Sequence, residues 1–429
     1  MTNRDIMMDY SMASSDTKIS SFPCTNAICR KDLLCRNYRK YKKRFGEQYF
    51  DFHPETFNLP DELQLLKRRM YETKSIWIVK PATGFAGKGI KVVTKADQIG
   101  DSKSNITVQK YVDNPFLIRG LKFDIRLYVL LTSIDPLRVY IYNDGLVRFA
   151  TEAFSLKEED LGNSFIHVTN SGVNKENEVF NYGKDSNEFN GYKWTFKTLL
   201  RYLQAEGHDC SEILTNLRSL AFKTILCGRE DMKQGFKEVK SEYNCFKLFG
   251  FDVMLDEKLK PWLLEVNSFP SFEPEILDCS VNELLIAEMF NIVGIHLTNN
   301  LDHQQRISIK KKHGWKDFSD FDPKLYSKHF NVEEDEASEQ PSDEDLVHEA
   351  NLSVSQVLKL IRSEEEISQT RNFSRLYFGQ DLNHSDDTGF LSSWESAGDR
   401  LDCAWKARYG DNRDAGREVL TRLSQKIVL

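Results

Sequence analysis

The chain has 429 residues, of which 58 are lysine or arginine and 65 are aspartate or glutamate, giving a formal net charge of −7. Hydrophobic residues make up 40% and charged residues 29%, as in an ordinary globular protein. The mild acidity argues against a general nucleic-acid-binding protein. No stretch approaches the ~18 apolar residues needed to cross a membrane, and residues 1–20 lack the apolar core of a signal peptide. The irregularly spaced cysteines predict reduced thiols in an intracellular protein.

The N-terminal part of the chain divides into three expected segments. Residues 1–20 are polar and aperiodic, and we expect them to be disordered. Ile28–Arg44 is a strongly basic stretch, which is either a solvated helix face or a patch that faces an anion. Residues 61–73 are predicted to be helical, and Ser75–Val79 is rich in residues that favour a strand.

Between residues 80 and 300, predicted strands, turns and helices alternate as in an α+β fold. Strands are expected at 90–94 and 123–132, and helices at 194–205, 212–227 and 281–293. Asn143-Asp144-Gly145 lies between two strand-like runs and is the strongest hairpin signal in the sequence. A second hairpin is predicted from strands 245–255 and 261–267, which the charged turn Asp256–Lys260 connects.

The composition changes after residue 300. A basic segment at 301–330 precedes an acidic linker at 331–345, where self-repelling carboxylates and Pro341 predict disorder. Residues 346–366 are expected to form a helix, whereas the last sixty residues show little periodicity. Residues 346–429 therefore form an extension of undefined role, which we expect to be dispensable for chemistry.

The first candidate for chemistry is the glycine- and lysine-rich segment Lys80–Ile90. Glycines let a backbone approach phosphate oxygens, and lysines neutralise their charge. The segment does not match a P-loop, which needs glycine at Ala82, serine or threonine at Gly89, and a following helix. It is therefore predicted to be either a hairpin flap over phosphates or merely a flexible turn.

The second candidate is the predicted strand that begins near Lys122. Alternate residues of a strand share a face, so Lys122, Asp124 and Arg126 line up opposite an apolar face. An ordinary half-solvated strand would show the same pattern. Arg148 and the segment His167–Asn170 are further polar candidates, each of which is compatible with a structural role.

The third candidate is a set of three oxygen-bearing side chains. The hairpin about 256–260 brings Asp252 opposite Leu264 or Glu265, and Glu265 shares a strand face with Asn267. Two carboxylates and one amide, without histidine or cysteine, suit Mg²⁺ that carries nucleotide phosphates. A buried salt bridge to lysine or arginine is the alternative.

Several motifs in this order resemble the tubulin–tyrosine ligase-like family over roughly residues 20–300. They are KFDIR at 122–126, HVTN at 167–170, FGFD at 249–252 and KPWLLEVN at 260–267. The segments 114–118 and 145–152 are most similar to those of the polyglutamylases. The resemblance implies an ATP-grasp-like ligase core with an incomplete N-terminal lobe at 21–74, a central nucleotide-binding lobe at 75–118 and a catalytic lobe at 119–300.

The resemblance also implies roles for individual residues. Mg²⁺ would be held by Asp252, Glu265 and Asn267, and Arg126 would act with Glu265 in catalysis. Free glutamate would contact Arg148 and Lys193. The ATP site would be built from Lys80, Gly87, Lys88, Gly89, Gln109, Lys110, Tyr111, Val112, Lys122, Phe123, Asp124, Thr169 and Asn170.

The function that the resemblance implies is ATP-dependent ligation of free L-glutamate to glutamate side chains of α/β-tubulin C-terminal tails, through an acylphosphate. Two alternatives remain: a ligase for another amino acid such as glycine, or a weakly active microtubule-binding protein. Asn282 supports the latter, because the family usually has lysine there. We expect a monomer on cytoplasmic microtubules, with cilia and basal bodies as candidate locations and without nucleic-acid or membrane partners.

Overall fold

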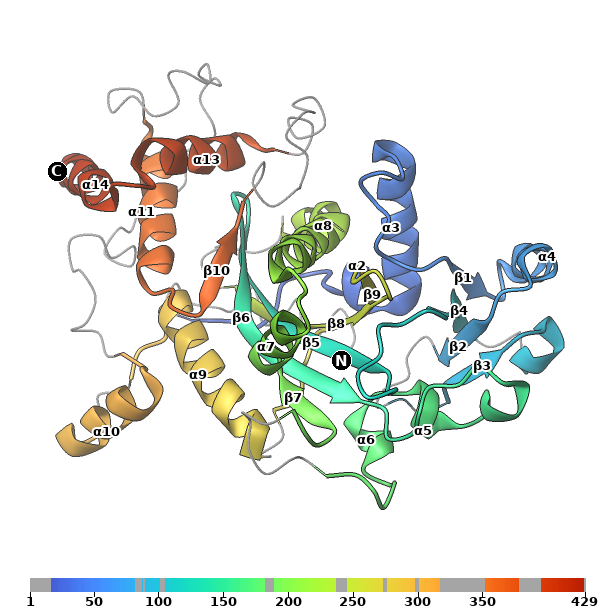
Figure 1. Cartoon of the computed structure of the whole chain (residues 1–429). Coiled ribbons are helices and arrows are strands. Elements are labelled where there is room, and N and C mark those ends of the chain that lie inside the picture. The colour runs from blue at the N-terminus through green and yellow to red at the C-terminus, as the bar shows by residue number, and fades with distance from the viewer. Residues whose placement is uncertain are drawn as a thin grey trace.

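The computed structural model describes residues 17–81, 87, 89–100, 105–181, 189–236, 245–272, 276–297, 301–316, 352–377 and 395–427. These residues form two antiparallel sheets with helices packed against them (Figure 1). The predicted α+β class is confirmed. Of the residues 1–20 predicted to be disordered, 1–16 fall outside the described residues, as does the acidic linker 331–345. For residues 17–20 the prediction is wrong, because Ile19 bridges Cys245 and the Ser20 carbonyl accepts from Lys247. No helix in the described ranges is both long and apolar enough to cross a membrane.

The smaller sheet has four strands in the order β1, β4, β2, β3. Their bounds are β1 (Thr56–Leu59), β2 (Trp77–Pro81), β3 (Lys91–Val93) and β4 (Ile106–Lys110). Helix α4 (Leu63–Thr73) buries Leu66 and Met70 against Trp77 of this sheet, and the short helix η1 (Ala96–Ile99) contributes Ile99 to the same core. Neighbouring strands β2 and β4 carry Lys80 and Gln109, so this sheet forms one wall of the site described below.

The larger sheet has six strands in the order β10, β6, β5, β8, β9, with β7 paired to β6. Their bounds are β5 (Phe123–Ile134), β6 (Leu137–Phe149), β7 (Lys193–Thr195), β8 (Lys247–Leu255), β9 (Pro261–Asn267) and β10 (Phe373–Leu376). Strands β8 and β9 are the predicted hairpin, and Asp252 lies directly opposite Glu265. The prediction that these two carboxylates meet across a hairpin is confirmed.

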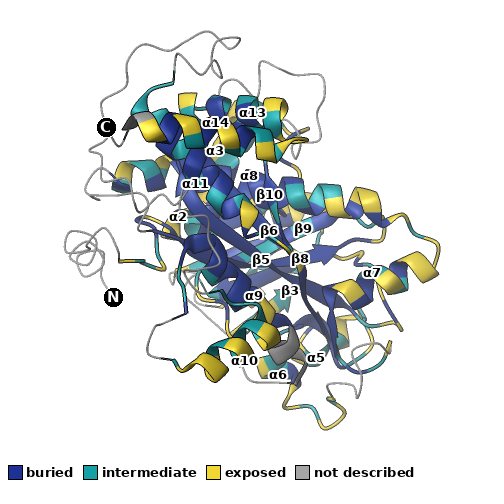
Figure 2. Cartoon of the chain, turned by 90° about the vertical axis from the view of Figure 1, so that its left-hand side faces the viewer, coloured by how far each residue is buried: buried dark blue, intermediate teal, exposed yellow. Residues whose placement is uncertain are grey.

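Helices cover both faces of the larger sheet, whose strands are almost wholly buried (Figure 2). One face packs against a set of helices that comprises α2 (Asn26–Cys29), α3 (Lys31–Phe45), α7 (Phe196–Ala205) and α8 (Cys210–Phe236). The other packs against α9 (Ile276–Val293). Because a strand alternates, Phe123 and Ile125 enter the first core, whereas Tyr128 and Leu130 enter the second. The polar residues Lys122, Asp124 and Arg126 continue the second face of the sheet beyond α9, and there they line a pocket.

The hairpin predicted at Asn143-Asp144-Gly145 is wrong, because all three residues lie inside the single strand β6. The register with β5 shifts there, from Leu127 opposite Gly145 to Val129 opposite Ile141, so residues 142–144 form an irregularity within the strand. A Cβ atom on Gly145 would lie 2.3 Å from the carbonyl oxygen of Arg126. Glycine is therefore needed for close approach of two strands, and not for a turn.

The extension after residue 350 packs onto the larger sheet. It contains α11 (Val354–Ser368), α13 (Ala397–Tyr409) and α14 (Arg413–Ile427), which share a small core, and β10, which pairs with β6. Glu366 of α11 accepts hydrogen bonds from Thr132, Arg138 and Tyr140 of β5 and β6. The predicted helix at 346–366 corresponds to α11. The periodicity of the sequence did not predict α13, α14 or β10. The contacts of Glu366 are buried, so the extension is packed firmly against the larger sheet.

The remaining described helices are short or lie at the surface. They are η2 (Glu158–Asp160), α5 (Ser164–His167), α6 (Ser171–Asn174) and α10 (His303–His313). Helices α5 and α6 lie under the smaller sheet in Figure 1 and bring His167–Asn170 to the pocket. Helix α10 contains most of the described part of the basic segment predicted at 301–330.

Candidate active site

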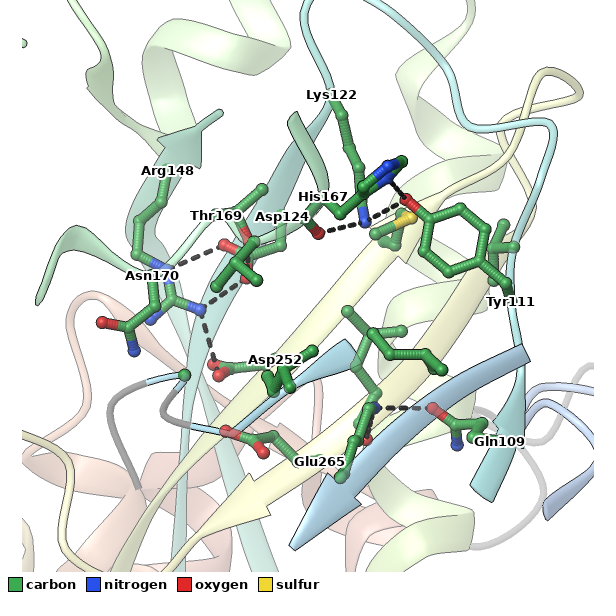
Figure 3. A pocket seen from close by; sticks show the side chains of 18 of the residues that line it. Gln109, Tyr111, Lys122, Asp124, Arg148, His167, Thr169, Asn170, Asp252 and Glu265 are labelled. Carbon is green, nitrogen blue, oxygen red and sulfur yellow. Dashed lines mark hydrogen bonds and ion pairs between the residues drawn. The ribbon is translucent and has the colours of Figure 1, made fainter. Parts of the chain in front are cut away.

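A cavity of about 160 Å³ lies between the two sheets and collects most of the residues singled out in the sequence (Figure 3). From the predicted set it is lined by Lys80, Gly87, Gln109, Lys110, Tyr111, Val112, Lys122, Asp124, Arg126, Arg148, Thr169, Asn170, Asp252, Glu265 and Asn267. Gly89, Phe123 and Lys193 do not line it, and Lys88 falls outside the described residues. Phe123 lies in the core beside Phe149, because its side chain points to the opposite face of β5 from Lys122 and Asp124.

Lys80 lines the first side of the cavity, and its side chain is buried. Its Nζ donates to Gln109 Oε1 at 2.7 Å, and the Gln109 amide nitrogen donates to Thr56 Oγ1 at 3.1 Å. Burial lowers the pKa of Lys80 to about 8, although Glu265 acts to raise it. Lys80 is therefore held in place by a neutral amide, and no carboxylate in the described part of the chain contacts its ammonium group directly.

The second side is a hydrogen-bonded group made by Lys122, Tyr111 and His167 (Figure 3). Lys122 Nζ donates to Tyr111 Oη at 2.9 Å and to the backbone carbonyl of His167 at 2.7 Å. His167 Nε2 donates to the carbonyl of Asp160 at 3.2 Å, so its unprotonated Nδ1 accepts from Tyr111 Oη at 2.9 Å. Burial lowers the pKa of Lys122 to about 7 and that of His167 to about 4. The ring of His167 is therefore neutral at physiological pH.

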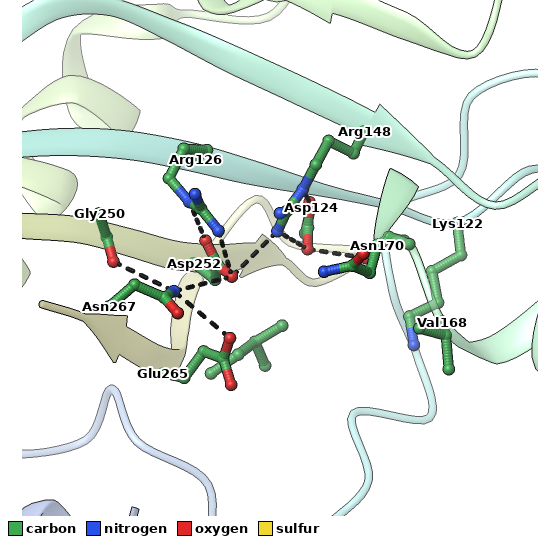
Figure 4. Close-up of polar contacts among 12 residues, drawn as sticks. Lys122, Asp124, Arg126, Arg148, Val168, Asn170, Gly250, Asp252, Glu265 and Asn267 are labelled. Atoms are coloured by element: carbon green, nitrogen blue, oxygen red, sulfur yellow. Dashed lines mark hydrogen bonds and ion pairs between the residues drawn. The ribbon is translucent and has the colours of Figure 1, made fainter. Parts of the chain in front are cut away.

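The third side is a chain of buried ion pairs (Figure 4). Arg148 donates to Asp124 through Nε at 2.8 Å and Nη2 at 2.6 Å, and Nη2 also lies 3.0 Å from Asp252. Arg126 forms a bidentate pair with the same Asp252. Burial alone would raise the pKa of Asp252, but the two guanidinium groups hold it well below its usual range. Asp252 is therefore ionised throughout the physiological range.

The predicted metal ligands converge at the edge of this ion-pair chain. Asn267 Nδ2 lies 3.3 Å from Asp252 Oδ2 and 3.3 Å from Glu265 Oε1. Within the described residues no cluster of three or more histidine, cysteine or acidic side chains could hold a metal. Two carboxylates and an amide oxygen nevertheless fit a hard cation that takes its other ligands from phosphate and water. In the structure the Asn267 amide donates to both carboxylates, so a bound cation would require the amide to present its oxygen.

The structure adds a residue that sequence reasoning missed, Lys31 at the start of α3. Its Nζ lies 3.1 Å from Glu265 Oε2, so the N-terminal end of α3 reaches a proposed metal ligand. Lys31 belongs to the predicted basic stretch, but nothing in that run distinguished it from its neighbours. Sequence reasoning also did not identify the apolar lining from Ile78, Ile90, Val168, Met254 and Leu264.

The other predicted substrate residues lie farther from the cavity. Lys193 on β7 is directly opposite Arg148 on β6, so the two side chains share one face of the sheet. Asn282 is a buried residue of α9, and Tyr128 donates a hydrogen bond to its Oδ1 at 3.3 Å. Like Lys193, Asn282 does not line the cavity.

Comparison with known sequences agrees with this geometry. The sequence model of the Tubulin-tyrosine ligase family matches residues 8–304, which include every residue of the cavity. The chain belongs to the tubulin-tyrosine ligase family. The resemblance drawn from the motifs is thereby confirmed.

The relatives within the tubulin-tyrosine ligase family are named as tubulin-modifying enzymes. Tubulin monoglutamylase TTLL4 of Homo sapiens is 41% identical over 289 residues, which cover 66% of this chain and 24% of that protein. Tubulin polyglutamylase TTLL5 of Homo sapiens is 38% identical over 284 residues, covering 66% and 22%. A probable beta-tubulin polyglutamylase of Tetrahymena thermophila is 34% identical over 307 residues, covering 69% and 26%. The match thus spans about a quarter of the length of these relatives.

Proposed function

We propose that this chain catalyses ATP-dependent addition of free L-glutamate to glutamate side chains of tubulin C-terminal tails. The observation that carries the proposal is the composition of one cavity. Lys80 and Lys122 line it together with Asp252, Glu265 and Asn267, and the guanidinium groups of Arg126 and Arg148 line it as well. Cations that can hold phosphates and oxygen ligands that can hold Mg²⁺ therefore face the same small volume, as ATP-grasp chemistry requires.

In the proposed complex, Lys80 and Lys122 contact the phosphates and the segment Gln109–Val112 contacts the base. Mg²⁺, held by Asp252, Glu265 and Asn267, would neutralise phosphate charge as phosphoryl transfer proceeds. The γ-phosphoryl group passes to a carboxylate of the acceptor glutamate, which gives an acylphosphate and ADP. The amine of free glutamate then attacks the acyl carbon, and inorganic phosphate leaves as the isopeptide bond forms. Arg126 would stabilise the charge that develops on the transferring group.

Free glutamate is assigned to the region of Arg148 and Lys193. Arg148 already uses Nε and Nη2 on Asp124 and Asp252, so Nη1 is the nitrogen that remains for a substrate carboxylate. Arg148 therefore supports both the amino-acid side and the nucleotide side of the site. Substitution of Arg148 should therefore affect the binding of both substrates.

We expect Arg148→Lys to raise the KM for glutamate and the KM for ATP together, by about tenfold or more each. A lysine ammonium cannot hold Asp124 and Asp252 at once while contacting a substrate, because it is a point charge and not a planar fork. Steady-state kinetics with each substrate varied in turn measures both constants. An unchanged KM for ATP would show that Arg148 serves the amino acid alone.

Proton uptake on ATP binding is the next expected result. In the free protein burial lowers the pKa of Lys122 to about 7, so this group is mostly neutral at pH 8. Phosphates nearby favour the charged form, so ATP binding should take up a proton above pH 7 and little below pH 6. Calorimetry in two buffers of different protonation enthalpy measures this uptake.

Lys122→Arg is the control for that experiment, since arginine is charged throughout. It should remove the uptake centred near pH 7 and leave the contribution of Lys80, whose pKa is lowered to about 8. If Lys122→Arg takes up as many protons as the wild-type chain, Lys122 does not contact the nucleotide.

Basic surface suits an acidic tubulin tail as the partner. Four cations of the predicted basic stretch are paired with acids: Arg30 with Asp32, Lys31 with Glu265, Arg39 with Glu62, and Lys42 with Glu47. Arg36, Lys40, Lys43 and Arg44 remain exposed at helical spacing on α3. This stripe, together with Lys311 and Lys312 on α10, is the surface to which we assign the tail.

Incorporation of radiolabelled glutamate into microtubules, with ATP and Mg²⁺, tests the proposal. Glycine and tyrosine in parallel reactions identify the amino acid. Incorporation of glutamate alone supports the proposal, and incorporation of glycine alone would replace glutamate with glycine as the substrate. Absence of any incorporation by a folded, ATP-binding chain would contradict it. The expected setting is cytoplasmic microtubules, including those of cilia or basal bodies, with the enzyme acting as a monomer.

A further inference from the structure

A second cavity, of about 720 Å³, lies away from the proposed active site. Three segments enclose it: the connection between α3 and β1, the first half of α8, and the turn between β8 and β9. Pro261 lines this cavity at the start of β9, whereas Glu265 lies near the other end of the same strand. Four residues of a strand span ~13 Å, so the two cavities are distinct.

One face of α8 carries a polar stripe into this second cavity. Asn216, Ser219 and Lys223 follow one another at helical spacing and all line it. Most neighbouring positions on the helix, such as Leu217 and Phe222, are buried in the apolar core instead. A polar stripe on a helix that is otherwise embedded in the core needs an explanation other than solvation.

Lys223 is the central feature of this cavity. Only 5% of the residue is exposed, and within the described residues its ammonium group makes no hydrogen bond or ion pair with a side chain or carbonyl. Burial lowers its pKa to about 8, with no nearby carboxylate to oppose the shift. An unpaired buried ammonium is costly, and a partner that supplies negative charge would remove that cost.

The other charged groups of the cavity lie at its rim. Asp51 is paired with Lys260, and Asp209 accepts from the backbone nitrogen of Ser211. Both of these carboxylates are therefore engaged, whereas Glu212 adds an exposed acid and Lys258 an exposed cation to the same cavity. The walls near Lys223 are apolar or aromatic, with Tyr49, Phe52 and Leu220 among them.

We propose that this cavity is a second binding site, which takes the carboxylate group of an acidic ligand against Lys223. The ligand's hydrocarbon part would pack on Tyr49 and Phe52, and the hydroxyl of Ser219 and the amide of Asn216 would complete the contacts of the carboxylate. A glutamate side chain of an acidic peptide and a free dicarboxylate share this chemistry. The site does not depend on the proposed activity, and its test requires no turnover.

Residue-resolved methylation of lysines with formaldehyde, on the full chain at pH 8, measures occupancy of Lys223. The probes are N-acetylglutamate and N-acetylated hexaglutamate, which have no amine to react, and exposed Lys67 on α4 is the reference. Lys223 should be methylated in the free chain, and a saturating probe that occupies ~90% of the sites should slow its reaction about tenfold. Protection by the peptide alone, or by both probes, distinguishes a polypeptide ligand from a small one.

Two results would overturn the proposal: Lys223 that does not react in the free chain, or Lys223 that reacts equally fast with both probes present. A matched pair of variants gives an independent measurement. Lys223→Met should lower the affinity for labelled N-acetylated hexaglutamate at least about tenfold without lowering the melting temperature, because an unpaired buried charge is lost. Lys67→Met should change neither the affinity for the peptide nor the melting temperature. Equal affinities in the two variants would also contradict the site, and if Lys223→Met fails to fold, the methylation result decides.

Discussion

Glu265→Gln is expected to abolish glutamate ligation while the chain stays folded. Glutamine keeps the shape of the side chain but removes one negative charge from the oxygen set made with Asp252 and Asn267. It also removes the ion pair between Glu265 and Lys31. A misplaced Mg²⁺ would no longer stabilise the charge that develops on the phosphoryl group, and loss of one such stabilising contact costs about 10²–10³-fold in rate. The Glu265 side chain is 28% exposed, so the lost ion pair should cost only about 1 kcal/mol of unfolding free energy.

The matched control for this variant is Glu62→Gln. Glu62 is 21% exposed and pairs with Arg39, which lies on the same helix α3 as Lys31. The control therefore loses the same charge and an ion pair to the same helix, but outside the cavity. Glutamate incorporation and thermal melting should be measured for both variants. Turnover by Glu265→Gln within a few fold of the control would contradict the assignment of the metal ligands.

Asp399→Ala is expected to lower the unfolding free energy by about 3–5 kcal/mol, because it leaves a buried arginine without its main counter-ion. Asp399 of α13 accepts from Arg229 of α8 at 2.6 Å and from the backbone nitrogen of Leu137 at 2.6 Å. The Asp399 side chain is 1% exposed and that of Arg229 is 3% exposed. Asp399 thereby joins the C-terminal extension to α8 and to the start of β6, so the loss of stability should extend to the catalytic fold.

Asp302→Ala provides the control for Asp399→Ala. Asp302 belongs to a capping box at the start of α10, as Asp399 does at the start of α13, but it is exposed and forms no ion pair in the described structure. Asp302→Ala should lower the unfolding free energy by only about 1 kcal/mol. Urea unfolding monitored by tryptophan fluorescence measures both changes. An equal loss of unfolding free energy in the two variants would mean that the extension is separable from the rest of the fold, as the sequence had suggested.

The sequence was informative wherever the relevant contacts are local. Alternation along β5 placed Lys122, Asp124 and Arg126 on one face, and the structure shows them lining one cavity. The hairpin of β8 and β9 was predicted with Asp252 opposite Leu264 or Glu265, and the structure selects Glu265. Both results depend on strand geometry over a few residues, where the side-chain period of two leaves little freedom.

Only the tertiary structure decided the features that join distant parts of the chain. Lys31 meets Glu265, Arg229 meets Asp399, and Lys223 is buried beside a cavity, yet none of these has a local signal. Asn143–Gly145 has the composition of a turn, but partner strands on both sides keep it inside β6. Turn and helix propensities amount to about 1 kcal/mol per residue, so packing between distant segments overrides them. The chemistry of the site was therefore readable from short motifs, whereas the surroundings that hold it were not.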